Sequence, residues 1–457
     1  MDALVDRFAP RAATEPELVA RHAEAAGRTD DAIVYLERGG DRAQARSAHE
    51  EAIVHMRKAL ALLETRPAGA ERDARELTLR LALAASLIAV RGHSHAETET
   101  AYERAAALAH SAGDPVRLGI ARTGLAIVYF TRGKVERGRA LAVEVLEAAE
   151  GRDDREQALI GHTNAAIPEF YQGKFASSLA HCERAVALYD PVQHHGFVRV
   201  LGNDQGIVAL DFAAWALWFL GRPDAAVVRA REAVALARRL AHPFNLASAV
   251  FWETILHWFR RDGAAQGERA AELIALSEPQ GFPFWLGLGR ALRAAAHVTE
   301  GDSGMLAEIS EGLVLASETR TRSGAPALFL LLAEAQHAAG LLADSRGTVA
   351  TGLAIAARTG QPAFDADLHR LDGDLLLATG SSDDEAAARY RHALALAREQ
   401  GARSLELRAT ARLARLLGDQ DRAVEGYKLL APIYASFTEG FDTVDLIEAK
   451  TLLDELR

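Results

Sequence analysis

One repeated pattern limits what this chain can fold into: two helices joined by a tight turn. Its clearest copy surrounds Gly221. Upstream, residues 210–220 are apolar almost all round, and downstream, residues 225–240 have apolar positions at helical spacing. Gly221 ends the first helix because glycine adopts positive φ at little cost, and Pro223 suits the first turn of the second helix. The segment therefore predicts a helical hairpin.

Turn-forming residues recur along the chain and divide it into similar units. From Gly92 onward they are separated by steps of 38 to 48 residues. The tetratricopeptide repeat has a period of about 34 residues and the HEAT and armadillo repeats have about 40–47, so spacing alone indicates a long helical-hairpin repeat. The turn markers are Gly27, Ser47, Gly92, Gly133, Gly173, Gly221, Gly263, Gly301, Gly340, Gly380 and Gly418.

The residues that follow these turns favour the tetratricopeptide class. Ala226, Ala230 and Ala233 lie on one face of the second helix, where small side chains let two helices approach closely. Four other units place small or bulky apolar residues at the same offsets from their turns: Ala52, Met56 and Ala59; Ser178, Cys182 and Ala185; Ala386, Tyr390 and Ala393; and Ala423, Tyr427 and Leu430. We expect an all-α, right-handed α-solenoid of tetratricopeptide-like hairpins with a period of about 40.

Composition restricts the partners and the compartment. The net charge is −11, which argues against a general nucleic-acid or anionic-membrane surface, although a local basic face stays open. Cys182 is the only cysteine, so an intrachain disulfide and a cysteine-based zinc site are excluded. The first residues contain no signal peptide, and no segment has the roughly 20 apolar residues that span a bilayer. We expect a cytoplasmic protein.

The repeats suggest three segments. Residues 1–66 hold an opening helix and the first hairpin, residues 67–433 the main solenoid, and residues 434–457 a loop and a capping helix. The 48-residue step contains an insertion at 190–209, whose proline and glycines predict a loop. A long loop in a regular solenoid is often functional, and a passive insertion is the alternative.

Motifs for catalysis, metal binding and phosphate binding are absent. No GxxxxGK[ST], GxGxxG, HExxH or GxSxG is present. His93 with His95, and His194 with His195, lack a third ligand at helical spacing, so we expect structural or exposed histidines and no metal or cofactor. An acidic cluster does not match a calcium loop and is expected at solvated helix ends; it comprises Asp365, Asp367, Asp372 and Asp374.

Aromatic residues are concentrated in the middle of the chain. All five tryptophans lie between residues 215 and 285. In a tetratricopeptide repeat the first helix lines the concave surface, and Trp215, Trp218 and Trp252 fall on such helices. Aromatic anchors in a groove suit a peptide or a partner helix, and a locally bulky core is the alternative. The expected groove combines these three tryptophans with nearby polar residues: Trp215, Trp218, Trp252, Arg199, Asn203 and Asp204.

Several strings resemble the C-terminal tetratricopeptide region of a bacterial signalling family. Its members join a class III adenylate/guanylate cyclase domain or a regulatory domain to an AAA-type ATPase domain and then to the repeats. The resemblance covers nearly the whole chain, but the cyclase aspartates and the ATPase phosphate loop are missing, so neither activity carries over to any residue. The most specific strings are PELVARHAEAAGRTDDAIVYLERGG (16–40), WALWFLGRPDAAV (215–227), GFPFWLGLG (281–289) and LLAPIYASFTEGFDTVDLIEAKTLLDEL (429–456).

These observations predict a non-enzymatic scaffold that binds a protein or peptide in its concave groove. The resemblance implies a sensor or regulatory role beside an ATPase or cyclase module, either as a stand-alone chain or as part of a larger protein. The alternative is a nucleotide- or small-molecule-responsive regulatory subunit of an ATP-dependent signalling enzyme, although the sequence supplies no phosphate cradle. No set of residues supports an enzyme.

Overall fold

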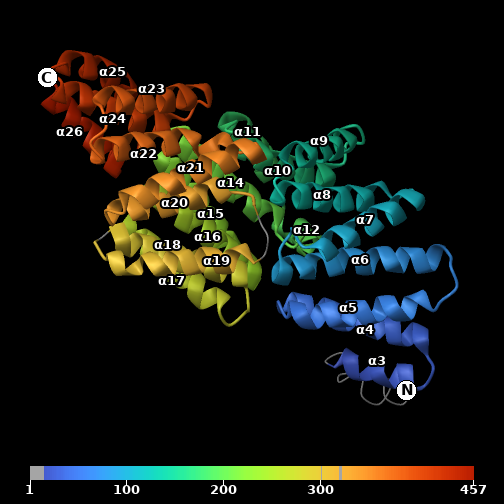
Figure 1. Cartoon of the computed structure of the whole chain (residues 1–457). Helices are drawn as coiled ribbons and strands as arrows, with labels where there is room; N and C mark the ends of the chain where they lie inside the picture. The colour runs from blue at the N-terminus through green and yellow to red at the C-terminus, as the bar shows by residue number, and fades with distance from the viewer. Residues whose placement is uncertain (1–14, 300, 319–321) are drawn as a thin grey trace.

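A computed structural model describes residues 15–299, 301–318 and 322–457. Throughout these residues the secondary structure is helical, and no strand occurs in them. Consecutive helices pack against each other as hairpins along the chain (Figure 1). The expected all-α solenoid of tetratricopeptide-like hairpins is confirmed. The first 14 residues of the expected opening segment lie outside the described part of the chain.

The helices are 10 to 22 residues long except in the insertion and at short 3₁₀ turns. Those up to the insertion are α3 (Pro16–Ala25), α4 (Thr29–Ala45), α5 (His49–Glu64), α6 (Ala70–Arg91), α7 (Ala96–Ser111), α8 (Pro115–Thr131), α9 (Val135–Glu150), α10 (Arg155–Tyr171) and α11 (Phe175–Leu188). After the insertion come α14 (Gln205–Phe219), α15 (Pro223–Leu240), α16 (Pro243–Phe259), α17 (Gly263–Ser277), α18 (Pro283–Thr299), α19 (Leu306–Ser317), α20 (Ala325–Ala338), α21 (Leu342–Thr359), α22 (Asp365–Ala378), α23 (Asp383–Glu399), α24 (Arg403–Asp419), α25 (Ala423–Ala435) and α26 (Val444–Glu455).

Most of the expected turn residues occupy turns, but two do not. Gly221 has φ +82°, and a Cβ there would lie 2.8 Å from the Cβ of Arg403, so both its conformation and its surroundings require glycine. Gly263 instead begins α17, and Gly418 lies inside α24. The left-handed positions of these two turns belong to Arg261 (φ 57°) and Asp421 (φ 61°). Glycine content alone therefore misplaces these two turns by two or three residues.

The insertion differs from the expected loop, because most of it is helical. It folds into α12 (Pro191–His194), the 3₁₀ turn η1 (His195–Phe197) and α13 (Val198–Leu201), and α14 then begins at Gln205. The Asp190 side chain accepts hydrogen bonds from the first backbone N–H groups of α12, which starts at Pro191. Gly206 belongs to α14, where a Cβ would lie 2.6 Å from the Tyr189 ring. The small size of Gly206 allows α14 to pack closely against Tyr189, and the residue does not mark a loop.

The first helices of successive hairpins form the inner layer of the solenoid. These inner helices contact one another in the order α8, α10, α14, α16, α18, α20, α22 and α24. The array curves so far that distant repeats touch: α14 contacts α24, and the Ser404 hydroxyl donates a hydrogen bond of 2.5 Å to the Trp218 carbonyl. The largest hydrophobic core runs along this inner layer, from α6 to α24.

The C-terminal helix α26 closes the last hairpin and also reaches a distant one. Its apolar face packs on α24 and α25. Outside this contact, Arg261 at the end of α16 forms ion pairs with Asp445 at 3.2 Å and Glu448 at 2.7 Å. The loop before α26 also approaches α15, where Glu439 accepts hydrogen bonds from the backbone N–H groups of Asp224 and Ala225. The end of the chain therefore fastens one turn of the solenoid to another.

Candidate functional site

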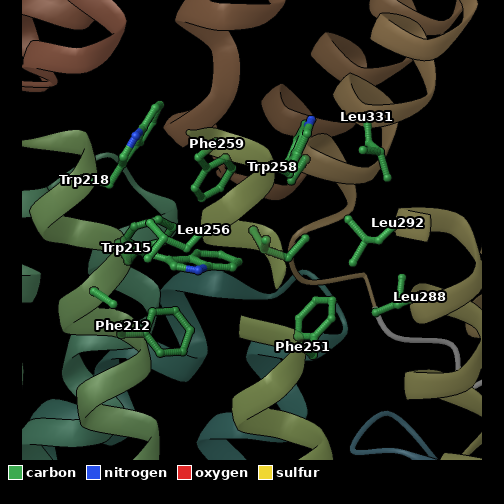
Figure 2. Packing of buried hydrophobic residues seen from close by; sticks show 14 of the residues in the cluster. Phe212, Trp215, Trp218, Phe251, Leu256, Trp258, Phe259, Leu288, Leu292 and Leu331 are labelled. Atoms are coloured by element: carbon green, nitrogen blue, oxygen red, sulfur yellow. The ribbon is translucent and has the colours of Figure 1, made fainter. Parts of the chain in front are cut away.

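The inner helices α14 and α16 build a layer of aromatic side chains in the middle of the molecule. Trp215 and Trp218 both contact Phe259 of α16, with ring centroids 5.2 Å and 5.0 Å apart. Figure 2 shows Trp218 and Phe259 on one side of this layer and Phe212 and Phe251 on the other. α14 is surrounded by α10, α11, α15, α16 and α24, and nearly all of its side chains are buried, most of them apolar. A cavity lies on each side of the layer.

The first cavity, called here the apolar cavity, lies among the inner helices α6 to α20 and has a volume of about 170 Å³. This volume is about ten times the space that one buried water requires. Nine aromatic side chains take part in its wall: Phe130, Tyr171, Phe212, Trp215, Phe244, Phe251, Trp252, Phe284 and Trp285. A central space is thus left unfilled between the segment after α13 and seven helices: α6, α8, α10, α14, α16, α18 and α20.

The wall of the apolar cavity is electrically neutral at pH 7. Its described lining contains no aspartate, glutamate, lysine or arginine. His93 and Tyr171 are its titratable groups. Burial lowers the pKa of His93 to about 4 and raises the pKa of Tyr171, so both are uncharged at neutral pH. The cavity therefore offers no counter-charge to a charged ligand.

Some polar groups of this wall bond to each other and two do not. The Trp215 indole donates a hydrogen bond of 3.1 Å to the Trp252 carbonyl, and the Trp252 indole donates one of 3.2 Å to the Ser248 hydroxyl. In contrast, the Nε1 of Trp285 and the Oδ1 of Asn203 are buried without a hydrogen-bond partner. Leaving such a group unpaired costs about 1–3 kcal/mol.

The second cavity, called here the charged cavity, lies on the other side of the aromatic layer and has a volume of about 470 Å³. Its walls come from α14, α16, α17, α18, α20, α22, α24 and α26. They carry four arginines and five carboxylates: Arg261, Arg370, Arg408, Arg412, Glu334, Asp367, Asp374, Asp445 and Glu448. The two cavities thus share the aromatic layer, but only the charged cavity is lined by charged side chains.

Arg408 of α24 is the centre of an ion-pair network in the charged cavity. It pairs with Asp367 at 2.9 Å and with Asp445 at 2.8 Å, and it donates to the Phe259 carbonyl. Its guanidinium also lies over the Trp218 ring, 4.9 Å from the centroid. One side chain thereby connects α14, α16, α22 and α26.

Arg370 of α22 extends the same network. It forms ion pairs with Asp367, with Asp374 at 2.8 Å and with Glu334 at 3.1 Å. Burial alone would raise the pKa of Asp367, but Arg370 and Arg408 lower it to about 2. Burial, assisted by the charge of Asp367, raises the pKa of Glu334.

No described side chain that lines the charged cavity has a buried polar atom without a partner. Its charges are thus satisfied within the protein. This arrangement corrects the expectation that the acidic cluster of α22 lies at solvated helix ends, because Asp367 and Asp372 are buried and Asp374 is nearly so. All four lie in α22: Asp367 and Asp374 pair with arginines of α24, Asp372 pairs with Arg389 of α23 at 2.9 Å, and Asp365 has a buried carboxylate oxygen without a partner.

The structure divides the residues of the expected groove between different places. Trp215, Trp252 and Asn203 line the apolar cavity, and Trp218 lines the charged cavity beneath Arg408. Trp215 and Trp218 are only 3% and 2% exposed, whereas Trp252 and Asn203 are half-buried. The accessible part of the expected groove is therefore the wall around Trp252 and Asn203.

The remaining two expected residues lie in the insertion. Asp204 is fully buried and accepts hydrogen bonds from the N–H groups of Gly206 and Ile207, so it caps α14. It also accepts a hydrogen bond of 2.8 Å from the Tyr189 hydroxyl. Arg199 belongs to α13, but its side chain lies outside what the structure describes.

Sequence reasoning missed the residues that most distinguish the two cavities. In the sequence Trp285 is one of five tryptophans, and nothing in its local pattern shows that its indole nitrogen lacks a partner. Arg408 and Arg370 resemble the many other arginines of an arginine-rich chain. The low exposure of Arg408 and Asp367 is known only from the structure, so the sequence carried no signal for this pair.

Two further observations limit other classes of site. Within the described ranges, no three histidine, cysteine or carboxylate residues come together as metal ligands. None of the helices in those ranges combines the length and the apolar character needed to cross a bilayer.

Comparisons with known proteins give one relative in sequence. No family model matches the chain. An uncharacterized protein of Rhizobium meliloti (strain 1021) is 26% identical to it over 401 residues, which are 86% of this chain and 38% of that protein. The chain thus spans well under half the length of this relative.

The solved structures with a similar arrangement are remote in sequence. A Rap protein complexed with competence and sporulation factor is 11% identical, with 93% of this chain and 99% of that chain covered and a TM-score of 0.44. A signal transduction ATPase with numerous domains and a tetratricopeptide repeat sensor, from Pyrococcus horikoshii, is 12% identical, with 97% and 74% covered and a TM-score of 0.36. A human IFIT1 dimer with PPP-AAAA is 15% identical, with 96% and 89% covered and a TM-score of 0.43.

Proposed function

We propose that this chain is a non-enzymatic repeat scaffold that binds a protein or peptide in its concave interior. The observation that carries the proposal is the apolar cavity, because seven helices converge on it with nine aromatic side chains and leave it unfilled. Aromatic side chains that line a concave surface are typical anchors for a partner's apolar side chains. The absence of the sequence motifs for catalysis is consistent with a binding role.

We place the partner's anchoring side chain against Trp252 and Asn203, with Trp215 behind them. The half-burial of Trp252 and Asn203 supports this position, because a partner can reach them without unfolding the aromatic layer. Trp218 supports that layer from the charged cavity. Asp204 and Arg199 complete the proposed site: Asp204 orders the segment that carries Asn203, and Arg199 is included from the sequence prediction, with its backbone in α13.

We further propose that the chain is the sensor or regulatory part of a bacterial signalling system that includes an ATPase or cyclase module. The resemblance of the repeat strings to such proteins motivates this role, and the greater length of the Rhizobium relative agrees with a larger assembly. Nucleic acid and membranes are not among the proposed partners. The net charge of −11 and the neutral wall of the apolar cavity support this restriction.

Peptide retention tests the binding proposal. The immobilised chain is incubated with a pool of random-sequence peptides, and retained peptides are identified by mass spectrometry. We expect retained peptides to be rich in one apolar residue and to be lost with Trp252→Ala. A Val54→Ala variant is the matched control, because Val54 lies on α5, is 61% exposed and lines neither cavity. Equal retention by all three proteins, or retention by none, contradicts the proposal.

A further inference from the structure

We infer that the apolar cavity accepts an uncharged, mainly aromatic organic group that carries a hydrogen-bond acceptor. This inference rests on the proposed function in taking the cavity as the binding site, and it adds the chemistry of what enters.

The charge of the wall excludes ionic occupants. The described lining holds no formal charge at pH 7, and moving an unpaired ion from water into such a site is strongly unfavourable. Arginines lie across the aromatic layer in the charged cavity, where Arg408 and Arg370 are already paired with carboxylates. Phosphates, nucleotides and free carboxylates therefore find no cationic partner in the apolar cavity.

The unpartnered polar atoms indicate which hydrogen bonds an occupant can supply. The Nε1 of Trp285 is a donor only, and the Oδ1 of Asn203 is an acceptor only. An acceptor on the occupant can therefore pair with Trp285, and a donor can pair with Asn203. Both atoms are covered by neighbouring atoms, so each pairing requires its side chain to rotate.

The limited polarity also excludes a length of peptide backbone from the cavity. Each residue of a peptide brings one N–H and one carbonyl that need partners once they are buried. The wall already uses the indoles of Trp215 and Trp252 and the amide of Asn164 in internal hydrogen bonds. The occupant is thus either a side chain that enters from a partner or a free small molecule.

The shape of the wall suits a planar group. The Trp215 and Trp252 rings meet nearly edge to face with centroids 4.3 Å apart, and Phe212 lies 4.8 Å from Trp252. Phe251 and Trp285 form a second ring pair at 5.2 Å. Aromatic rings stack or pack edge to face on such surfaces and gain more than area burial alone.

Fluorescence of a neutral probe tests the inference. Prodan is an uncharged naphthyl ketone whose emission rises on burial and shifts to the red when its carbonyl accepts a hydrogen bond. Anilinonaphthalene sulfonate has a similar aromatic body with a negative charge. We expect Prodan to bind the wild-type chain with at least tenfold higher affinity than the sulfonate. Equal or tighter binding of the sulfonate overturns the inference.

Variants locate the probe. Leu328→Trp and Val208→Phe each fill the apolar cavity from a different helix and should abolish Prodan binding. Trp285→Phe keeps a ring but removes the donor, so we expect a three- to tenfold loss of affinity and a blue shift of the bound emission. Trp258→Phe is the matched control in the charged cavity and should leave both unchanged. Binding that survives both filling variants in folded protein, or a Trp285→Phe protein with unchanged affinity and emission, overturns the inference.

Competition distinguishes the two sources of the group and separates this inference from the proposed function. Displacement of Prodan by the retained peptides assigns the group to a partner's side chain, and Prodan binding that no peptide displaces assigns it to a free small molecule. Peptide retention without Prodan binding would leave the proposed function standing and defeat the inference. Prodan binding without peptide retention would support the inference and contradict the proposed function.

Discussion

The two cavities share one aromatic layer, but they differ in how the polar groups of their walls are paired. In the charged cavity four arginines and five carboxylates pair with one another, and no buried polar atom of its described wall is left over. In the apolar cavity the described wall has no charge, and two of its buried polar atoms lack partners. A cavity whose polar groups all bond within the protein stabilises the fold. A cavity with unpartnered polar groups can gain hydrogen bonds from a bound molecule.

The charged cavity explains how an array of neighbour contacts becomes a closed structure. Helical repeats are normally stabilised by contacts between adjacent units. Here Arg408 bonds to the Phe259 carbonyl, 149 residues earlier, and lies over Trp218. Arg261 reaches Asp445 across 184 residues. These bonds hold the last repeats against the aromatic layer, and that layer forms one wall of the apolar cavity.

The largest expected effect is on the charged cavity. Arg408→Met removes the shared cation and leaves Asp367 and Asp445 without their common partner. Breaking a buried ion pair from one side costs about 3–5 kcal/mol, so the midpoint of urea unfolding should fall accordingly. The measurement is urea denaturation followed by near-ultraviolet circular dichroism, which reports the packing of the tryptophans.

Arg412→Met is the control for this change. Arg412 also pairs with a carboxylate of α22, Asp374 at 3.2 Å, but its side chain is 44% exposed. Exposed ion pairs contribute little, so we expect less than about 1 kcal/mol. Equal destabilisation by the two variants would show that burial of the Arg408 network does not hold the repeats together.

The second effect separates two of the three tryptophans that line the apolar cavity. Trp215→Ala removes a ring that is fully packed in the aromatic layer and should cost about 3–5 kcal/mol. Trp252→Ala removes a half-buried ring and should cost about 2 kcal/mol, because less area returns to water. Urea denaturation measures the loss of unfolding free energy in both variants. A larger loss from Trp252→Ala than from Trp215→Ala would show that the half-buried ring contributes more to the core than the packed one.

The third effect uses the pH dependence of stability to distinguish His93 of the apolar cavity from Asp367 of the charged cavity. Burial lowers the pKa of His93 to about 4, below its unfolded value of 6.5, so the unfolded chain binds the proton first. The stabilisation from neutral His93 is present above pH 6.5 and is lost as the pH falls toward 4. His93→Gln should remove about 1–3 kcal/mol of this pH dependence.

In the charged cavity, Asp367 responds at lower pH than His93 does. The arginines lower the pKa of Asp367 to about 2 from an unfolded value of 3.8, so its contribution is complete above pH 3.8 and is lost as the pH falls through 2. Urea denaturation at a series of pH values should therefore show a His93-dependent decline before an Asp367-dependent one. An Asp367→Asn variant that changes the slope between pH 4 and 6.5 contradicts this order.

The smallest effect concerns a single neutral donor. The Tyr390 hydroxyl donates a hydrogen bond of 2.7 Å to Asp374, which also receives Arg370 and Arg412. Because two charged donors remain, Tyr390→Phe should cost only about 1 kcal/mol. A loss near that of Arg408→Met, measured in the same denaturation series, would mean that the network depends on Tyr390 as much as on its central arginine.

The hairpins were predictable because they depend on local properties. Gly221 and Pro223 mark the turn, and Ala226, Ala230 and Ala233 are buried where the second helix meets its neighbours. The insertion was less predictable, since Asp190 and Asp204 act as helix caps while Gly206 serves close packing. The same residue types can also form a loop, so composition alone did not distinguish the two.

The cavities were only partly predictable because they depend on curvature. The five tryptophans all line one of the two cavities, but Trp215 and Trp218 line different ones. Which helices meet there is fixed by contacts such as Ser404 with Trp218, 186 residues apart. No local pattern in the sequence shows that these two residues meet. The pairing of Arg408 with Asp367 depends on the same arrangement of helices.

One crystallographic measurement tests the difference between the cavities most directly. Crystals of the full chain would be soaked with a brominated acetylnaphthalene, an uncharged ketone, and the bromine would be located from its anomalous signal. We predict a bromine site inside the apolar cavity, with the ketone oxygen within hydrogen-bond distance of the Trp285 Nε1, and none in the charged cavity. A bromine site in the charged cavity, or only on the outer surface, would contradict the account.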